Sequence, residues 1–159
     1  MSIIDTSDTQ PPKYKGFRAG IVPYWIDPDD GTILYMFMKP SDGKYGGTDW
    51  QIAKGRFDEG EYNAEEVAIR EGSEELGLKR ENIKSVHYLD IIRKMYVYFC
   101  EVEDMEDFNP FHEETGDVCW LSYDEFLLFG RDIHQDIMEM INDKVLELNS
   151  TPSTVEIEY

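Results

Sequence analysis

The segment NAEEVAIREGSEELGL, residues 63–78, constrains the fold of this chain more than any other stretch. Asn63, followed three residues later by Glu66, predicts a helix that begins with a side-chain cap and a reciprocal carboxylate contact. Gly77 predicts the end of the helix, because glycine readily adopts the left-handed conformation that closes one. At about 100° per residue, the apolar side chains of the helix fall on the same face as its later glutamates.

These later glutamates are Glu71, Glu74 and Glu75. Like charges three and four residues apart repel each other on a helix, and partial burial of unpaired carboxylates is more unfavourable still. A bound Mg²⁺ would compensate them, because this hard cation takes oxygen ligands and is often shared between carboxylates and substrate phosphates. Taken alone, REGSEE is more typical of a solvated acidic face, so the surrounding residues have to decide between the two interpretations.

Together with the surrounding residues, the glutamates form the pattern Gly55, Glu61, Arg70-Glu71, Glu74-Glu75 and Gly77-Leu78. This pattern resembles the signature of the Nudix hydrolase family. The resemblance implies that the three glutamates and the backbone carbonyl of Gly55 bind a divalent cation, Mg²⁺ or Mn²⁺. It implies that Arg70 and Glu61 orient the loop and the helix. It also implies an α/β fold, the Nudix-type α/β/α sandwich with a mixed β-sheet between helices, and hydrolysis of diphosphate linkages in nucleotide derivatives.

The chain departs from the family pattern in two places. The eight residues 62–69 separate Glu61 from Arg70 where the family has seven, so a contact between those two side chains is in question. Gly72 replaces an apolar residue, and glycine inside a helix is destabilising by about 0.5–1 kcal/mol relative to alanine unless something packs closely against it. Neither departure removes a metal ligand.

Other candidate site residues lie outside this motif. Glu114, six residues before Trp120, resembles a residue of Nudix enzymes that act on dinucleoside polyphosphates and RNA 5′ ends, where it is a metal ligand or a base. Glu113 is the alternative. WQIAKG resembles a stretch of the same subgroup in which the lysine, here Lys54, faces phosphate. Further candidates, each also typical of an ordinary surface or packing residue, are Arg18, Lys39 and Arg56 for phosphate and Tyr45 or Tyr96 for base stacking. The three histidines are scattered, and no catalytic role is predicted for them.

Length and charge limit the classes of protein to consider. A chain of 159 residues suits one domain, and a formal net charge of −19 argues against binding duplex DNA through a basic face. The chain begins without the features of a signal peptide and has no run near the roughly 18 apolar residues of a membrane span. We therefore expect a cytoplasmic protein without a membrane segment. Cys100 and Cys119 lie in apolar runs and are expected in the core.

The remaining segments predict strands and two more helices around the motif. We expect a flexible segment 1–13, a domain over 14–148 and a flexible tail 149–159. Strands are predicted at 17–26, 32–39, 50–55, 85–93, 95–102 and 117–121. Ser122 with Glu125 predicts a capped helix that ends near Gly130. A last helix is predicted over 132–148, with a core-facing stripe of Ile133, Ile137, Met140, Ile141, Val145 and Leu148.

The expected function is magnesium-dependent hydrolysis of a diphosphate linkage. The favoured substrates are dinucleoside polyphosphates such as diadenosine tetraphosphate, or the 5′-triphosphate end of RNA, because Tyr96 lies near a tyrosine position of diadenosine-polyphosphate hydrolases. ADP-ribose and oxidised nucleotides are alternative substrates. The alternative of another class is a Nudix-like domain that has lost catalysis and binds a nucleotide as a regulatory module. Family members are often dimers, so a homodimer is a further expectation.

Overall fold

The computed structural model describes residues 15–40, 49–109 and 115–155, without the side chains of residues 115, 116 and 151–155. Within these ranges, six strands form one mixed sheet. The strands are β1 (Arg18–Ile26), β2 (Ile33–Pro40), β3 (Ala53–Arg56), β4 (Ile83–Ile92), β5 (Met95–Val102) and β6 (Thr115–Leu121). The helices are α3 (Ala64–Leu76), α4 (Tyr123–Phe129) and α5 (Gln135–Val155), with short 3-10 helices η1 (Arg80–Asn82) and η2 (Asp132–His134).

Along one of its edges, strand β1 pairs with two different strands. The sheet order is β4-β5-β1-β2-β6, with β1 and β5 parallel and the other pairs antiparallel. The last residues of β1 pair with β2, from Tyr24 opposite Tyr35 onward, whereas its first residues pair with β3. In that second pairing Gly20 lies opposite Lys54. The sheet therefore brings the start of β1 next to the strand that precedes the glutamate helix.

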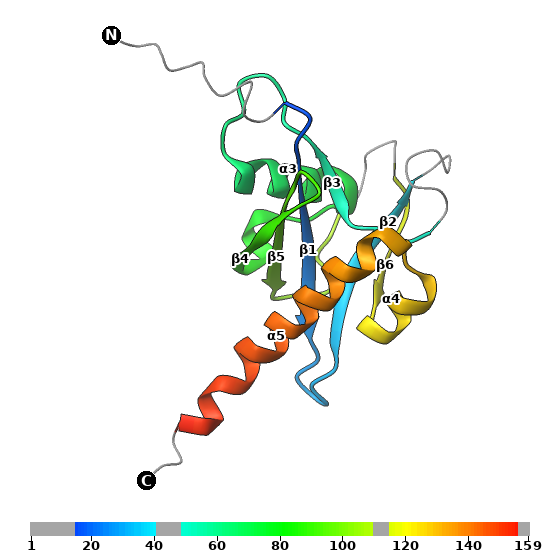
Figure 1. Cartoon of the computed structure of the whole chain (residues 1–159). Coiled ribbons are helices and arrows are strands. Elements are labelled where there is room, and N and C mark those ends of the chain that lie inside the picture. Colours follow the sequence, from blue (N-terminus) through cyan, green and yellow to red (C-terminus); the bar gives the residue numbers. More distant parts are fainter. Residues whose placement is uncertain (1–14, 41–48, 110–114, 156–159) are drawn as a thin grey trace.

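Helices cover both faces of the sheet (Figure 1). On one face, α3 buries Val67 and Ala68 against a cluster that includes Ile21 of β1 and Cys100 of β5. On the other face, α5 packs against the sheet through Ile137, Met138, Ile141 and Val145, and α4 adds Phe126, whose ring stacks on Phe37 at 4.3 Å between centroids. This arrangement confirms the α/β/α sandwich with a mixed sheet. None of the described helices has the length and apolar composition needed to cross a membrane.

The glutamate helix has the limits that its sequence predicts. Asn63 Oδ1 accepts a hydrogen bond from the backbone N–H of Glu66, and Gly77 closes the helix with a φ of 80°. The close packing that would justify Gly72 is also present, since a Cβ there would lie 2.8 Å from Ile21 Cγ2. The expected reciprocal contact of the Glu66 carboxylate is wrong. That carboxylate accepts a hydrogen bond from the Arg80 guanidinium of η1, a charged donor that attracts it more strongly than a backbone amide does.

Two other expectations need correction. The run 50–55 is not one continuous strand. Trp50 and Gln51 form isolated bridges, and the N–H of Ile52 donates a hydrogen bond to His134 Nδ1 before β3 begins. In the last helix, the predicted apolar stripe is only partly buried, because the buried face is centred on Ile137, Met138, Ile141 and Val145. The stripe members Ile133, Met140 and Leu148 are 47%, 40% and 46% exposed.

The last helix is also longer than its sequence predicts. It is expected to end near Leu148, yet α5 continues to Val155. Two polar residues after Leu148 bond to carbonyls of the preceding turn: Asn149 Nδ2 donates to the Val145 oxygen at 2.8 Å, and Ser150 Oγ donates to the Glu147 oxygen at 3.3 Å. The cysteine expectation is confirmed for Cys100, which is buried and unpaired, whereas Cys119 is half-buried.

Candidate active site

Arg70 connects the loop after β3 to the glutamate helix. Its Nε and Nη2 donate to the two carboxylate oxygens of Glu61, each at 2.8 Å, and Nη2 also donates to the backbone oxygen of Arg56 at 3.0 Å. The contact between Glu61 and Arg70 therefore forms despite the additional residue between them. Glu61 in turn accepts from the backbone N–H of Asp58 at 2.6 Å, and the Arg70 hydrogen bonds are the main reason why the pKa of Glu61 is lowered.

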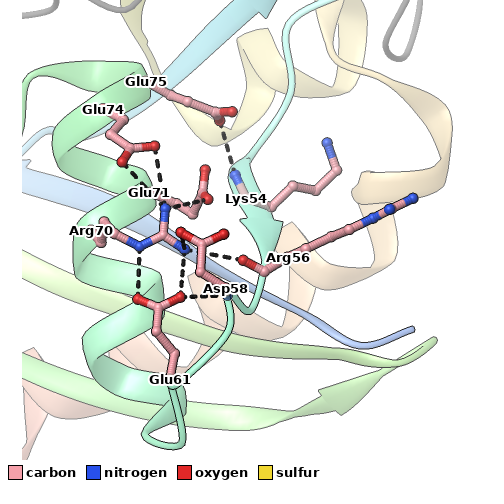
Figure 2. Close-up of polar contacts among 8 residues, drawn as sticks. All are labelled: Lys54, Arg56, Asp58, Glu61, Arg70, Glu71, Glu74 and Glu75. Atoms are coloured by element: carbon pink, nitrogen blue, oxygen red, sulfur yellow. Dashed lines mark hydrogen bonds and ion pairs between the residues drawn. The ribbon is translucent and has the colours of Figure 1, made fainter. Parts of the chain in front are cut away.

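The same guanidinium lies between two of the predicted metal ligands (Figure 2). Its Nη1 is 3.0 Å from Glu71 Oε2 and 3.3 Å from both oxygens of Glu74. Glu75 turns the other way and accepts from the backbone N–H of Lys54 at 3.0 Å. In the described parts of the chain, no three His, Cys, Asp or Glu side chains converge as a metal centre would require. In this arrangement, Arg70 compensates the charge of Glu71 and Glu74.

Gly55 and Glu71 approach each other too closely for any side chain at position 55. A Cβ at Gly55 would lie 2.1 Å from the Glu71 carboxyl carbon. Glu71 is only 8% exposed, and this burial raises its pKa although Arg70 opposes the rise. The Gly55 backbone and the three helix glutamates thus offer only oxygen donors, the ligand type that suits Mg²⁺ or Mn²⁺. The chemistry of these donors fits a hard divalent cation, although the side chains do not converge on one point in this arrangement.

These groups line one cavity of about 800 Å³. One wall carries Asp58, Glu71, Glu74 and Glu75. The basic residues that line the cavity are Arg18, Lys54, Arg56, Arg70, Arg93, Lys94 and Arg131. That is seven of the 15 lysines and arginines in a chain of net charge −19. Basic side chains gathered in this way attract an anionic ligand. The neighbouring carboxylates would repel the same ligand unless they bound a metal cation.

The other predicted site residues lie in different places. Lys39 is not among the described lining residues; its ammonium lies 4.7 Å from the centre of the Trp50 ring. Tyr96 packs its ring against Phe17 and Phe57, at 5.8 and 6.0 Å between centroids, on the α3 side of the sheet. Lining residues in the described ranges do not include Tyr96. The remaining candidates, Tyr45, Glu113 and Glu114, lie outside the described residues.

Arg93 and Lys94 are cavity residues that sequence reasoning missed. They form the two-residue turn between β4 and β5, with φ values of 50° and 67°. This left-handed turn is the one that joins antiparallel strands most readily, although Asn-Gly is its usual sequence. Arg93 also donates to both carboxylate oxygens of Asp136 at 2.9 Å, which ties the hairpin to the start of α5. The predicted strands implied the turn, but nothing local indicated that it faces the cavity.

Gln51, Arg131 and His134 were missed as well. His134 is 3% exposed and accepts a hydrogen bond from the N–H of Ile52 through Nδ1 at 3.2 Å. Burial, with the nearby positive charges of Lys54 and Arg131, lowers the pKa of His134 to about 3. The ring is therefore neutral at physiological pH, and its remaining proton is on Nε2. These residues come from two distant segments, so only the fold brings them together.

Comparison with known proteins identifies the family of the chain. Residues 17–141 match the family model of the NUDIX domain. The chain therefore belongs to the Nudix family, which confirms the expected family and the expectation of a Nudix hydrolase. A search of the curated proteins found no significant match.

Solved structures share the fold at low sequence identity. The Ap4A hydrolase of C. elegans, in a binary complex, is 16% identical with a TM-score of 0.64, over 82% of this chain and 97% of that chain. The Nudix hydrolase RenU of M. smegmatis is 15% identical with a TM-score of 0.65, over 81% and 86%. The NUDIX domain of Shewanella oneidensis NrtR, crystallised with ADP ribose, is 13% identical with a TM-score of 0.58, over 87% and 94%.

Proposed function

We propose that this chain is a pyrophosphohydrolase that requires Mg²⁺ or Mn²⁺ and acts on nucleotides. The observation that carries the proposal is the contact of Gly55 with Glu71 in a cavity that also gathers seven basic residues. Glu71, Glu74, Glu75 and the carbonyl of Gly55 would hold the metal. When bound, such a cation neutralises charge on phosphate oxygens and lowers the pKa of a water that attacks phosphorus.

The chain's own residues position the reacting groups. Glu61 fixes the guanidinium of Arg70, and Arg70 fixes the loop against the helix through the Arg56 oxygen. Lys54 is next to Gly55 in β3 and presents an ammonium to a phosphate in the cavity. Burial lowers the pKa of Lys54 to about 8, with Glu75 opposing this, so the side chain remains mostly charged at neutral pH. Glu114, or its neighbour Glu113, is proposed as a further metal ligand or as the base.

We favour dinucleoside polyphosphates such as diadenosine tetraphosphate, or RNA 5′-triphosphate ends, as the substrates. The number of basic residues in the cavity supports a ligand with many phosphates, and the fold is shared with an Ap4A hydrolase. A panel of nucleotides assayed with Mg²⁺, with every product identified, tests this choice. Cleavage of diadenosine tetraphosphate or of a 5′-triphosphate RNA supports the proposal, and a clear preference for ADP-ribose or an oxidised nucleotide contradicts it.

The second candidate is a domain that binds a nucleotide without cleaving it. The shared fold with the NUDIX domain of NrtR, which binds ADP ribose in its crystal structure, motivates this alternative. The three helix glutamates weigh against it, because a binding module has no need of several carboxylates on a partly buried face. Calorimetry that shows tight nucleotide binding without metal, together with no product from the panel, would favour the binding module.

A further inference from the structure

The strand β3 separates the cavity into an acidic part and a basic part. Successive side chains of a strand point to opposite faces, so Gly55 faces α3 while its neighbours Lys54 and Arg56 face the α5 side. Figure 2 shows this division: the three helix glutamates lie on one side of the strand, and both basic side chains extend away from them. The side chain of Lys54 has room because its partner across the sheet is Gly20, whose missing Cβ would lie 3.1 Å from Lys54 Cβ.

In the basic part, Gln51 has a buried amide of which only the oxygen has a partner among the described residues. Its side chain is 1% exposed, Oε1 accepts from Lys54 Nζ at 2.9 Å, and Nε2 makes no hydrogen bond within the ranges that the structure describes. The orientation of the amide is fixed chemically, since an ammonium can only donate and must therefore meet the oxygen. Buried donors without a partner are rare in native proteins. Gln51 also lines the cavity, so we take its buried, unpaired N–H group as an indication of a ligand there that accepts hydrogen bonds.

His134 adds a second neutral donor on the same wall. Its Nδ1 accepts from the Ile52 N–H, so the neutral ring carries its proton on Nε2. His134 lies in η2, immediately before α5, and lines the cavity together with Gln51. Each of the two residues thus lines the cavity and has an N–H group, while His134 Nδ1 accepts from Ile52 and Gln51 Oε1 accepts from Lys54.

Two guanidinium groups complete the wall. Arg131 and Arg18 line the same cavity as Lys54. Neither guanidinium has an ion pair or hydrogen bond to a side chain in the described ranges, unlike Arg70 and Arg93. An anion bound between these cations would reduce their mutual repulsion and give both guanidinium groups a charged partner.

We propose that Gln51, Lys54, His134, Arg131 and Arg18 form a second anion subsite, which takes a phosphate group of the substrate other than the diphosphate at the carboxylates. This inference rests on the proposed function for the identity of the ligand, and it deepens that function. The subsite lies on the α5 side of β3, so one diphosphate held at the glutamates cannot also fill it. The substrate class that fits both parts of the cavity is a chain of three or more phosphates.

Inorganic tripolyphosphate, titrated by calorimetry in the presence of EDTA, tests the subsite without metal or catalysis. We expect the wild type to bind it, and Arg131→Ala to bind it about tenfold more weakly or worse, since a charge-assisted contact is lost. Gln51→Glu should weaken binding as well, because the new carboxylate pairs with Lys54 and repels the ligand. Lys144→Ala is the control, since Lys144 is an exposed residue of α5 that pairs only loosely with Glu147 at 3.8 Å.

Kinetics with two substrates provides the second test. Arg131→Ala should lower kcat/KM for diadenosine tetraphosphate by about tenfold or more and leave kcat/KM for ADP-ribose, which has two phosphates, nearly unchanged. Equal tripolyphosphate affinity in wild type and Arg131→Ala, or no binding by wild type, overturns the subsite. If Arg131→Ala binds tripolyphosphate more weakly but the wild type cleaves no nucleotide, the subsite is supported and the proposed function is refuted. If the wild type cleaves nucleotides but Arg131→Ala binds tripolyphosphate as tightly as the wild type does, the proposed function is supported and the subsite is refuted.

Discussion

Gly55 and Glu71 are packed so closely that the carboxyl group of one occupies the place where a side chain of the other would be. The glycine at position 55 of β3 is therefore required by space. It allows a buried carboxylate on α3 to reach the backbone of the neighbouring strand. The absence of a Cβ at position 55 thus determines where the Glu71 carboxylate lies.

Gly55→Ala should accordingly impair activity more than stability. The new Cβ, 2.1 Å from the Glu71 carboxyl carbon, would displace that carboxylate from β3. A misplacement of this size at a catalytic group lowers turnover by about 100-fold. Steady-state kinetics with Mg²⁺ checks this, with a thermal melt to show that the fold is retained. Wild-type turnover in Gly55→Ala would show that Glu71 does not act from this position.

Arg70→Lys should destabilise the protein, although the charge is kept. A lysine cannot make the two parallel bonds to Glu61 and the bond to the Arg56 oxygen at once. We expect the free energy of unfolding to fall by about 1–3 kcal/mol in a denaturant titration. Arg80→Lys is the control, because the exposed pair of Arg80 with Glu66 should change stability by less than about 0.5 kcal/mol. Equal effects of the two substitutions would contradict the connecting role of Arg70.

Gly72→Ala should destabilise the protein although alanine favours helices. Its Cβ would lie 2.8 Å from Ile21 Cγ2, which is the branch of a buried β1 side chain and cannot move aside easily. Overpacking of about 1–3 kcal/mol should outweigh the helix gain of about 0.5–1 kcal/mol. Ser73→Ala, one residue further along the same helix and half-buried, should instead be neutral or slightly stabilising. A more stable Gly72→Ala protein would show that α3 can move away from the sheet.

The buried His134 should make the protein less stable in acid. Its pKa of about 3 in the folded state lies below the usual value of 6.5, so the unfolded chain takes up a proton that the folded chain does not. The stabilising effect is complete above about pH 6.5 and is lost as the pH falls toward 3, by up to about 1.4 kcal/mol per pH unit. His134→Asn, which keeps an acceptor for the Ile52 N–H, should flatten this part of the stability profile. If the free energy of unfolding fell with pH equally in wild type and His134→Asn, a neutral, buried His134 would be contradicted.

The sequence predicted the parts of the site that depend on neighbours along the chain. The limits of α3 follow from Asn63 and Gly77, which act within one helical turn, and the acidic wall follows from the spacing of the glutamates on that helix. The packing reason for Gly72 was also foreseeable, because a glycine in a helix needs a close neighbour. Only the structure could name that neighbour as Ile21.

The residues on the basic side of the cavity could not be predicted as a group, because they share no local sequence pattern. Arg93 comes from a hairpin, Arg131 from the loop before η2, and Gln51 from an irregular stretch before β3. The same limit explains the errors. Glu66 pairs with Arg80, which lies beyond the end of its helix, and the buried face of α5 is set by the sheet beneath it. Both results depend on tertiary contacts, and the spacing of residues within one segment does not predict such contacts.

The turnover of diadenosine tetraphosphate by Glu75→Gln at saturating Mg²⁺ tests the central claim most directly. Glutamine keeps an acceptor for the Lys54 N–H, so the fold and the melting temperature should be retained while a carboxylate is lost from the metal site. We predict that turnover falls by about 100-fold or more relative to wild type, while Glu66→Gln, on the same helix but paired with Arg80, remains active. Near-normal turnover of Glu75→Gln would contradict the account.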